Sequence, residues 1–195
     1  SPNASMTRAM LVTVLYRLEG QPAVNGRSGF SDVQYNGYYE DAVTWAADNG
    51  IVNGTSTTTF SPNANVTREQ MAAILYRYAQ YKKYNTAASS SLNGFTDQAS
   101  VSGYAAASLE WAVAEKLVNG SAGKLMPTGN ATRAQVAAIL YRYAQYKKYN
   151  TAASSGLNGF TDHASVSSYA VTSLQWSVAE KLVNGSAGKL MPTGN

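Results

Sequence analysis

The sequence contains no cysteine, which excludes disulfides, thiolate metal ligands and cysteine nucleophiles. It has no run of about 18 or more apolar residues, so we expect no membrane insertion. Its first residues do not resemble a signal peptide, from which we expect a mature or excised fragment. Charged residues make up only 13% of the chain, and their balance of +4 indicates a mild preference for an anionic partner.

What the sequence does have is an internal repeat. Residues 67–130 recur at 132–195 with nine substitutions in 64 positions, and a looser copy runs from residue 7 to residue 65. This period is longer than that of helical-hairpin repeats, which is about 34 residues. Units of this size rarely bury a core alone, so we expect residues 1–195 to form one assembly. Its repeat units are residues 1–61, 62–126 and 127–195.

Each unit is expected to open with an amphipathic helix. In residues 67–84, Thr67 is a natural N-cap, Gln70 completes a capping box, and apolar residues follow with helical spacing. Residues 132–149 repeat this pattern, whereas Met10 replaces the glutamine in the first unit and breaks the box there. Shorter second helices are expected at residues 38–49, 102–116 and 167–181.

The segments after the second helices read as turns, and no alternating run supports a sheet, so the predicted fold class is mostly α. Each turn segment holds one large apolar anchor. The anchors are Phe60, Leu125 and Leu190. Residues 1–5 resemble residues 61–65, so the chain opens with the segment that precedes a capping threonine in the other units. The three whole units are thus circularly permuted, which suits a closed three-fold arrangement. We therefore expect the two termini to approach each other.

An arginine follows each capping threonine, and it is the clearest functional signal. A cation in the first helical turn interacts unfavourably with the helix dipole, which costs roughly 0.3–1 kcal/mol when the side chain is exposed. A guanidinium beside free helix N–H groups makes a suitable seat for a carboxylate or a phosphate. The alternative is an internal salt bridge to the aspartate of a repeated Phe-x-Asp motif, and the two roles are compatible. The arginines are Arg8, Arg68 and Arg133.

The repeated aspartates and tryptophans each allow two interpretations. An aspartate after an aromatic residue either caps a turn or accepts hydrogen bonds from sugar hydroxyls. A tryptophan within the second helix either packs in the core or stacks on a sugar ring. The candidate ligand residues of these two kinds are Asp32, Asp97, Asp162, Trp45, Trp111 and Trp176. The same choice applies to Tyr38, Tyr104 and Tyr169.

Catalysis is not expected, because the acidic residues are not shared among the units. Glu115 and Glu180 match each other, but Asn49 stands in their place in the first unit, and the lone His163 is opposite Gln98. Paired carboxylates, metal-ligand clusters and phosphate-binding loops are absent from the sequence. We therefore expect no enzyme activity, no cofactor and no metal site.

Basic and aromatic residues alternate at 76–84 and again at 141–149, a pattern compatible with nucleic-acid stacking. Basic side chains in a last helical turn are, however, what the helix dipole favours. The first unit also lacks the cluster, since it reads Tyr16-Arg17-Leu18-Glu19-Gly20 there. We therefore interpret these segments as solvated helix ends and expect no nucleic-acid partner.

Taken in order, the motifs of each unit resemble the S-layer homology (SLH) domain family. They are the Thr-Arg helix start, Phe-x-Asp, the tryptophan of the second helix, the turn at 50–54 and the Phe-Ser-Pro-Asn at 60–63. By the family's convention the modules are residues 28–84, 93–149 and 158–195, the third without its final helix. The sequence departs from the family's Thr-Arg-Ala-Glu tetrad, and tyrosine replaces a tryptophan common at the start of the second helix.

The resemblance implies a pseudo-three-fold spindle, a monomeric pseudo-trimer with a central three-helix bundle and three helical prongs. It implies an extracellular location in the bacterial cell wall or S-layer. It also implies non-covalent binding of an anionic secondary cell wall polysaccharide, often bearing pyruvate ketals, in grooves between prongs beside the Thr-Arg helix starts. The alternative is a structural spacer or protein-docking module in which the arginines only bridge to aspartates.

Overall fold

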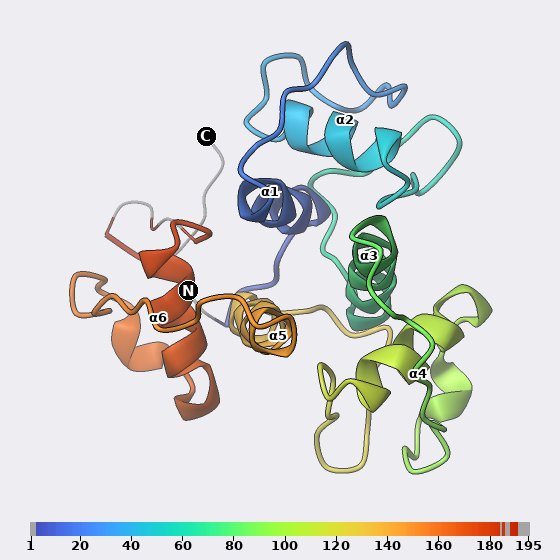
Figure 1. The fold of residues 1–195 in the computed structure, drawn as a ribbon, viewed down its shortest axis with the longest axis vertical. Helices are drawn as coiled ribbons and strands as arrows, with labels where there is room; N and C mark the ends of the chain where they lie inside the picture. Colours follow the sequence, from blue (N-terminus) through green and yellow to red (C-terminus); the bar gives the residue numbers. More distant parts are fainter. Residues whose placement is uncertain (1–2, 184, 186–187, 191–195) are drawn as a thin grey trace.

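Each of the three units contributes one long and one short helix. The structure is a computed structural model and describes residues 3–183, 185 and 188–190. The long helices are α1 (Arg8–Leu18), α3 (Arg68–Tyr81) and α5 (Arg133–Tyr146). The short helices are α2 (Glu40–Asp48), α4 (Ala106–Ala114) and α6 (Val171–Ala179). Figure 1 shows the long helices end-on around the middle of the molecule and the short helices outside them.

The long helices begin where the sequence predicts, at the capping threonines. The Thr67 hydroxyl accepts a hydrogen bond from Gln70 N, and the Gln70 side chain accepts one from Thr67 N, so the capping box is confirmed. Thr132 and Gln135 form the same box. Thr7 caps α1 through Met10 N alone, as the missing glutamine predicts.

The short helices are shorter than predicted. The expected starts at residues 102 and 167 are wrong by about one turn, because 3₁₀ turns at Gly103–Ala105 and Ser168–Ala170 precede α4 and α6. The expected start at residue 38 precedes the observed start of α2 at Glu40. Gly50 ends the first of these helices in the left-handed conformation with φ of 66°, and Lys116 and Lys181 adopt it with φ of 57° and 56°.

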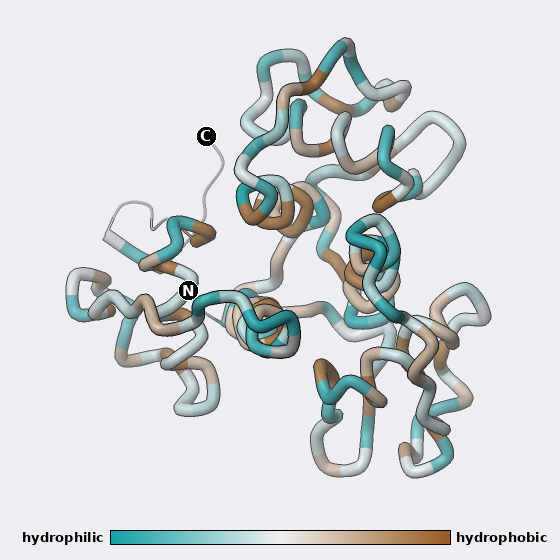
Figure 2. The backbone as a smooth tube through the Cα atoms, viewed as in Figure 1, coloured by the Kyte–Doolittle hydropathy of each residue, from teal (hydrophilic) through white to brown (hydrophobic). Residues whose placement is uncertain are grey.

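Aromatic pairs join each short helix to the long helix of its own unit. Tyr16 packs on Trp45 with ring centroids 5.6 Å apart, and the equivalent pairs Tyr76–Trp111 and Tyr141–Trp176 are 5.4 and 5.5 Å apart. The predicted turn anchors Phe60, Leu125 and Leu190 are all buried. Figure 2 shows much of the hydrophobic colour on the central helices, whereas the outer loops are largely pale or hydrophilic. The core therefore lies between the long helices and the inner faces of the short ones.

The segment before each long helix connects neighbouring units in a cyclic order. Among the described residues the only β pairing is isolated bridges, and three of them link these segments: Thr7 with Asn65, Thr67 with Asn130, and Ser5 with Thr132. The third bridge places the N-terminal segment beside α5. The predicted approach of the two chain ends is not tested, because residues 191–195 lie outside the described part.

Candidate functional site

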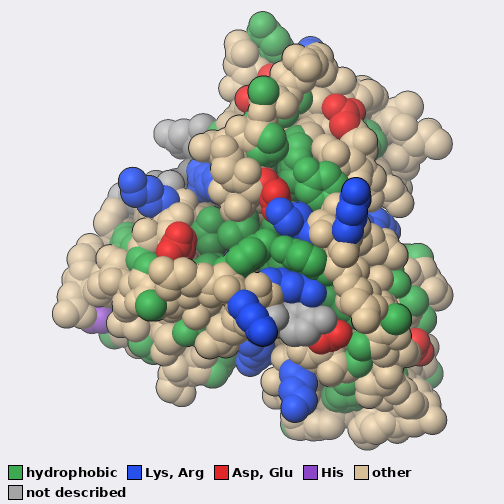
Figure 3. All heavy atoms as spheres, viewed as in Figure 1, with side chains coloured by type: hydrophobic (Ala, Val, Ile, Leu, Met, Phe, Trp, Pro, Cys, Tyr) green, Lys and Arg blue, Asp and Glu red, His purple; other side chains and the backbone are tan. Residues whose placement is uncertain are grey.

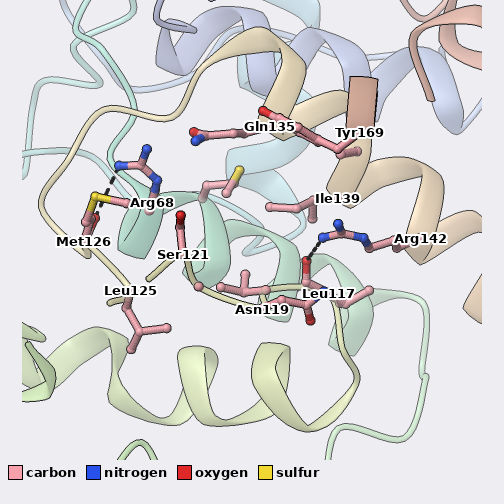
Figure 4. Close-up of a pocket in the computed structure, with 14 residues that line it drawn as sticks. Arg68, Leu117, Asn119, Ser121, Leu125, Met126, Gln135, Ile139, Arg142 and Tyr169 are labelled. Carbon is pink, nitrogen blue, oxygen red and sulfur yellow. Dashed lines mark hydrogen bonds between the residues drawn. The ribbon is translucent and has the colours of Figure 1, made fainter. Parts of the chain in front are cut away.

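A cavity of about 290 Å³ lies where the second unit meets the third. It is lined by Arg68 at the start of α3, the turn at residues 117–126, one side of α5 from Gln135 to Arg142, and Tyr169 (Figure 4). We call it the Arg68 cavity. Its volume is at the lower end of the range for small-molecule sites, about 300–1,000 Å³. It can therefore hold a ligand of limited size, such as one ring with its substituents.

Two guanidinium groups face the Arg68 cavity. Arg68 Nη1 makes one long hydrogen bond, 3.5 Å to the Met126 carbonyl oxygen, and Arg142 Nη1 donates to the Leu117 carbonyl oxygen at 3.0 Å. Gln135 uses its amide oxygen in the capping box, which leaves its NH₂ group to donate elsewhere. Figure 4 shows the ends of Arg68 and Gln135 on one side of the cavity and Arg142 on the other. The guanidiniums thus retain donors for a ligand.

The cavity wall carries positive charge without a balancing carboxylate. Neither aspartate nor glutamate is among the described residues that line it. Burial lowers the pKa of Arg68, but an arginine with a normal pKa above about 12 stays charged at neutral pH. The remaining lining is largely apolar and consists of Met71, Leu117, Val118, Leu125, Met126, Ala138 and Ile139. A partly desolvated cation beside an apolar wall favours a ligand with an anionic group and an apolar face.

Arg8 holds the same helix position in the first unit but is engaged internally. Its side chain is 5% exposed, with Nε donating to the Phe60 carbonyl oxygen at 2.8 Å and Nη2 to the Asn53 carbonyl oxygen at 2.9 Å. The guanidinium also lies 4.7 Å from the centroid of the Phe60 ring. Arg8 therefore stabilises the turn of its own unit.

Arg133 is also buried, at 6% exposed. Its Nη2 lies 3.8 Å from the sulfur of Met10, and its Nε and Nη1 have no hydrogen-bond partner among the described residues. Burial lowers its pKa, while the charge of Asp162 acts in the opposite direction.

For Arg8 and Arg68, the salt bridge to the Phe-x-Asp aspartate is absent from the ion pairs of the described residues, which are Arg27–Glu40 and Lys82–Glu19.

The repeated aspartates close the turns of their own units. Both carboxylate oxygens of Asp32 accept backbone hydrogen bonds, from Phe60 N and Ser61 N at 2.8 Å each. Asp97 does the same with Leu125 N and Met126 N, and these bonds lower its pKa, the one from Leu125 most. Asp162 accepts from Leu190 N at 2.8 Å. A carboxylate oxygen of Asp32 or Asp97 that accepts one backbone bond has a second lone pair. A bond from a sugar hydroxyl to the repeated aspartates stays a prediction.

The aromatic candidates separate into buried and exposed groups. The indoles of Trp45, Trp111 and Trp176 are buried against the long helices, as the core interpretation expects. Stacking of a sugar on them stays an untested prediction. The tyrosines at the starts of the short helices are exposed instead, and Tyr169 is 53% exposed beside the Arg68 cavity. The exposed members are Tyr38, Tyr104 and Tyr169.

Sequence reasoning missed the second guanidinium of the site. An arginine stands nine residues after each Thr-Arg arginine, and this spacing was a signal available in all three units. These arginines are Arg17, Arg77 and Arg142. Arg77 and Arg142 fell within the basic segments that were interpreted as helix ends. Figure 3 shows lysine and arginine side chains gathered around the middle of the face that looks along the central helices.

None of the helices in the described part of the chain has the length and apolar character that crossing a membrane requires. Within that same part, acidic and histidine side chains do not come together in a group of three or more that could hold a metal ion.

Comparison with known proteins gives a consistent result. The family model of the S-layer homology domain matches residues 29–72 and 94–137. An amylopullulanase of Thermoanaerobacterium thermosulfurigenes is 35% identical over 145 residues, which is 72% of this chain and 8% of that protein. An endoglucanase of Bacillus sp. (strain KSM-635) is 33% identical over 141 residues, 72% of this chain and 15% of that protein. The surface-layer 125 kDa protein of Lysinibacillus sphaericus is 32% identical over 149 residues, 73% of this chain and 12% of that protein.

Proposed function

Because this chain belongs to the S-layer homology domain family, we propose that it anchors a bacterial surface protein to the cell wall by binding an anionic wall polysaccharide. Domains of this family bind cell-wall components, and the chain is accordingly extracellular and associated with the cell wall or surface. The finer part of the proposal is the ligand: a secondary cell wall polysaccharide with carboxylate substituents such as pyruvate ketals. The attachment is non-covalent.

The Arg68 cavity is the observation that carries this proposal. Arg68 and Arg142 present guanidinium donors to a space whose described lining has no acidic residue. A guanidinium pairs with a carboxylate through directional, charge-assisted hydrogen bonds. The apolar wall beside it suits the methyl group of a ketal or an N-acetyl group and the less polar face of a sugar ring. Tyr169 offers an exposed ring at the same place.

The cyclic pairing of the three units supports a pseudo-three-fold spindle, which is part of the proposal. In such a spindle the long helices form the central bundle and the short helices form the prongs (Figure 1).

Co-sedimentation with purified cell walls tests the proposal. The protein should pellet with walls and should stay in solution when the secondary polymer has been stripped from them by acid. The double variant Arg68→Ala, Arg142→Ala should fail to pellet while its thermal unfolding stays close to that of the wild type. Full pelleting of the folded double variant would contradict the proposed role of these arginines.

The second candidate function is a spacer or protein-docking module, and the state of Arg8 favours it. This arginine donates to two carbonyl oxygens of its own unit and therefore has a structural role there. If all three Thr-Arg arginines were of this kind, walls with and without the polymer would retain the chain equally. Pelleting that is insensitive to stripping would support this function over glycan binding.

The enzymatic names of two relatives belong to proteins of which the matching region is 8% and 15%. S-layer homology domains are non-catalytic anchoring domains, and we propose that this chain likewise contributes attachment rather than turnover. A chain attached to an amylopullulanase-like or surface-layer-like protein would hold it at the cell surface.

A further inference from the structure

We propose that Gly129 is a positioning residue that keeps the Arg68 guanidinium at the Arg68 cavity, and that this makes the Arg68 cavity the principal anion-binding site of the chain. The inference rests on the proposed function, binding of an anionic wall polysaccharide. It adds that the three Thr-Arg arginines are unequal, with one presented to a ligand and two withdrawn into the fold.

Three residues hold the same place opposite the three arginines. The backbone N–H of Arg8 donates to the Ala64 carbonyl oxygen at 2.9 Å, and that of Arg68 donates to the Gly129 carbonyl oxygen at 3.0 Å. In the third unit Arg133 N donates to the Ala4 carbonyl oxygen at 3.1 Å, because the N-terminal segment lies beside α5. These equivalent places are thus Ala64, Gly129 and Ala4.

The glycine among them makes room for a guanidinium. A Cβ atom added to Gly129 would lie 2.4 Å from Nη1 and 3.7 Å from Cζ of Arg68. Such a distance to Nη1 is far inside van der Waals contact, so an alanine there would displace the end of the Arg68 side chain. Gly129 is not among the described residues with positive φ, so its backbone does not itself require glycine. The effect of glycine at this position is therefore the space that it leaves for the Arg68 guanidinium.

The two alanine places coincide with the two buried arginines. Arg8 opposite Ala64 is 5% exposed and bonds to carbonyl oxygens, and Arg133 opposite Ala4 is 6% exposed. Arg68 opposite Gly129 is partly exposed, lines the cavity, and has the single 3.5 Å bond described above. The presence or absence of one methyl group therefore matches the state of the arginine in all three units.

A second feature distinguishes the surroundings of Arg8 from the Arg68 cavity. Tyr104, the counterpart of Tyr169, donates its hydroxyl to Glu69 at 3.1 Å, and Glu69 also accepts from Ser102 N and Ser102 Oγ. Tyr104 also lies close enough to Arg8 for the two groups to interact electrostatically. The chain therefore places its own carboxylate, Glu69, beside the tyrosine that lies near Arg8, where it repels an anionic ligand. The positions equivalent to Glu69 are Ala9 and Ala134.

Gly129→Ala tests the inference, with Gly94→Ala as the matched control. Gly94 is exposed and a Cβ there would meet nothing within 4 Å. The probe is a hexosamine carrying a pyruvate ketal, titrated into the full chain by calorimetry, with the unmodified hexosamine as reference. The wild type should bind about one probe per chain. Arg68→Ala should weaken this binding by about 10–100-fold and Gly129→Ala by about 5-fold or more, whereas Gly94→Ala should leave it unchanged.

Two further readouts distinguish positioning from a general loss of structure. The Arg68 Nε–Hε NMR resonance of the free protein should move in Gly129→Ala and not in Gly94→Ala. The double variant Arg68→Ala, Gly129→Ala should bind no more weakly than Arg68→Ala alone, since both changes act through one side chain.

Wild-type affinity in Gly129→Ala, or binding of three probes per chain, would overturn the inference while leaving wall binding intact. A wild type that binds neither the probe nor intact walls would overturn the proposed function and the inference together.

Discussion

Arg8→Ala should strongly destabilise the protein, whereas the equivalent Arg68→Ala should scarcely affect its stability. Arg8 donates two hydrogen bonds of 2.8 and 2.9 Å and lies over the Phe60 ring, and its removal leaves one buried and one partly buried carbonyl oxygen with fewer partners. Each bond to a charged group contributes about 1.5–3 kcal/mol. The variant no longer has to desolvate a buried guanidinium, and this gain offsets part of the lost bond energy. We therefore expect a net loss of about 2–4 kcal/mol.

The comparison with Arg68→Ala supplies the internal control. Arg68 is partly exposed and makes one bond of 3.5 Å, so its truncation should change the free energy of unfolding by less than about 0.5 kcal/mol. The assay is urea unfolding followed by circular dichroism, together with the melting temperature. For a chain of this size about 2–4 kcal/mol corresponds to a decrease of about 4–16 °C. Equal stabilities of the two variants would refute the division between a structural and a ligand-facing arginine.

Three further perturbations follow from individual residues. Lys116→Gly should raise the free energy of unfolding by about 0.5–1 kcal/mol, because lysine adopts φ of 57° at a helix end where Gly50 stands in the first unit; an unchanged urea midpoint would contradict this. Backbone bonds lower the pKa of Asp97 in the folded state, so its stabilising effect should be present above the unfolded pKa and decrease as the pH falls through the folded pKa. The free energy of unfolding should therefore decrease less steeply with falling pH in Asp97→Asn than in the wild type. An identical slope would argue against the turn bonds. Partial desolvation of its hydroxyl and the Glu69 carboxylate raise the pKa of Tyr104 to about 12. Glu69→Gln should therefore lower this pKa in an ultraviolet titration of tyrosinate, and an unchanged pKa would be the contrary result.

The long helices could be predicted from local sequence because their caps and apolar stripes are encoded within a few residues. Thr67 and Gln70 lie three positions apart and form the expected box. The starts of the short helices were less predictable, since Tyr104 and its neighbours form a 3₁₀ turn that bonds to Glu69 on another helix. That contact depends on packing between elements and has no local signal.

The site divides in the same way. The repeated Thr-Arg motif directed attention to the starts of the long helices, where Arg68 lines a cavity, and the role of the three arginines in binding stays a prediction. The motif alone does not reveal which arginine is presented, because this depends on Gly129 and Ala64, residues of a segment that approaches the helix only in the folded chain. The position of Arg142 likewise follows from the neighbouring unit, which closes the far side of the cavity.

The decisive measurement is the affinity of the full chain for the soluble wall polysaccharide before and after its acidic substituents are removed. We predict that binding to the intact polymer is strong and that the neutral polymer binds about 10–100-fold more weakly, matching the effect of Arg68→Ala on the intact polymer. Equal affinity for the acidic and neutral polymers would contradict an anion-binding role for the Arg68 cavity.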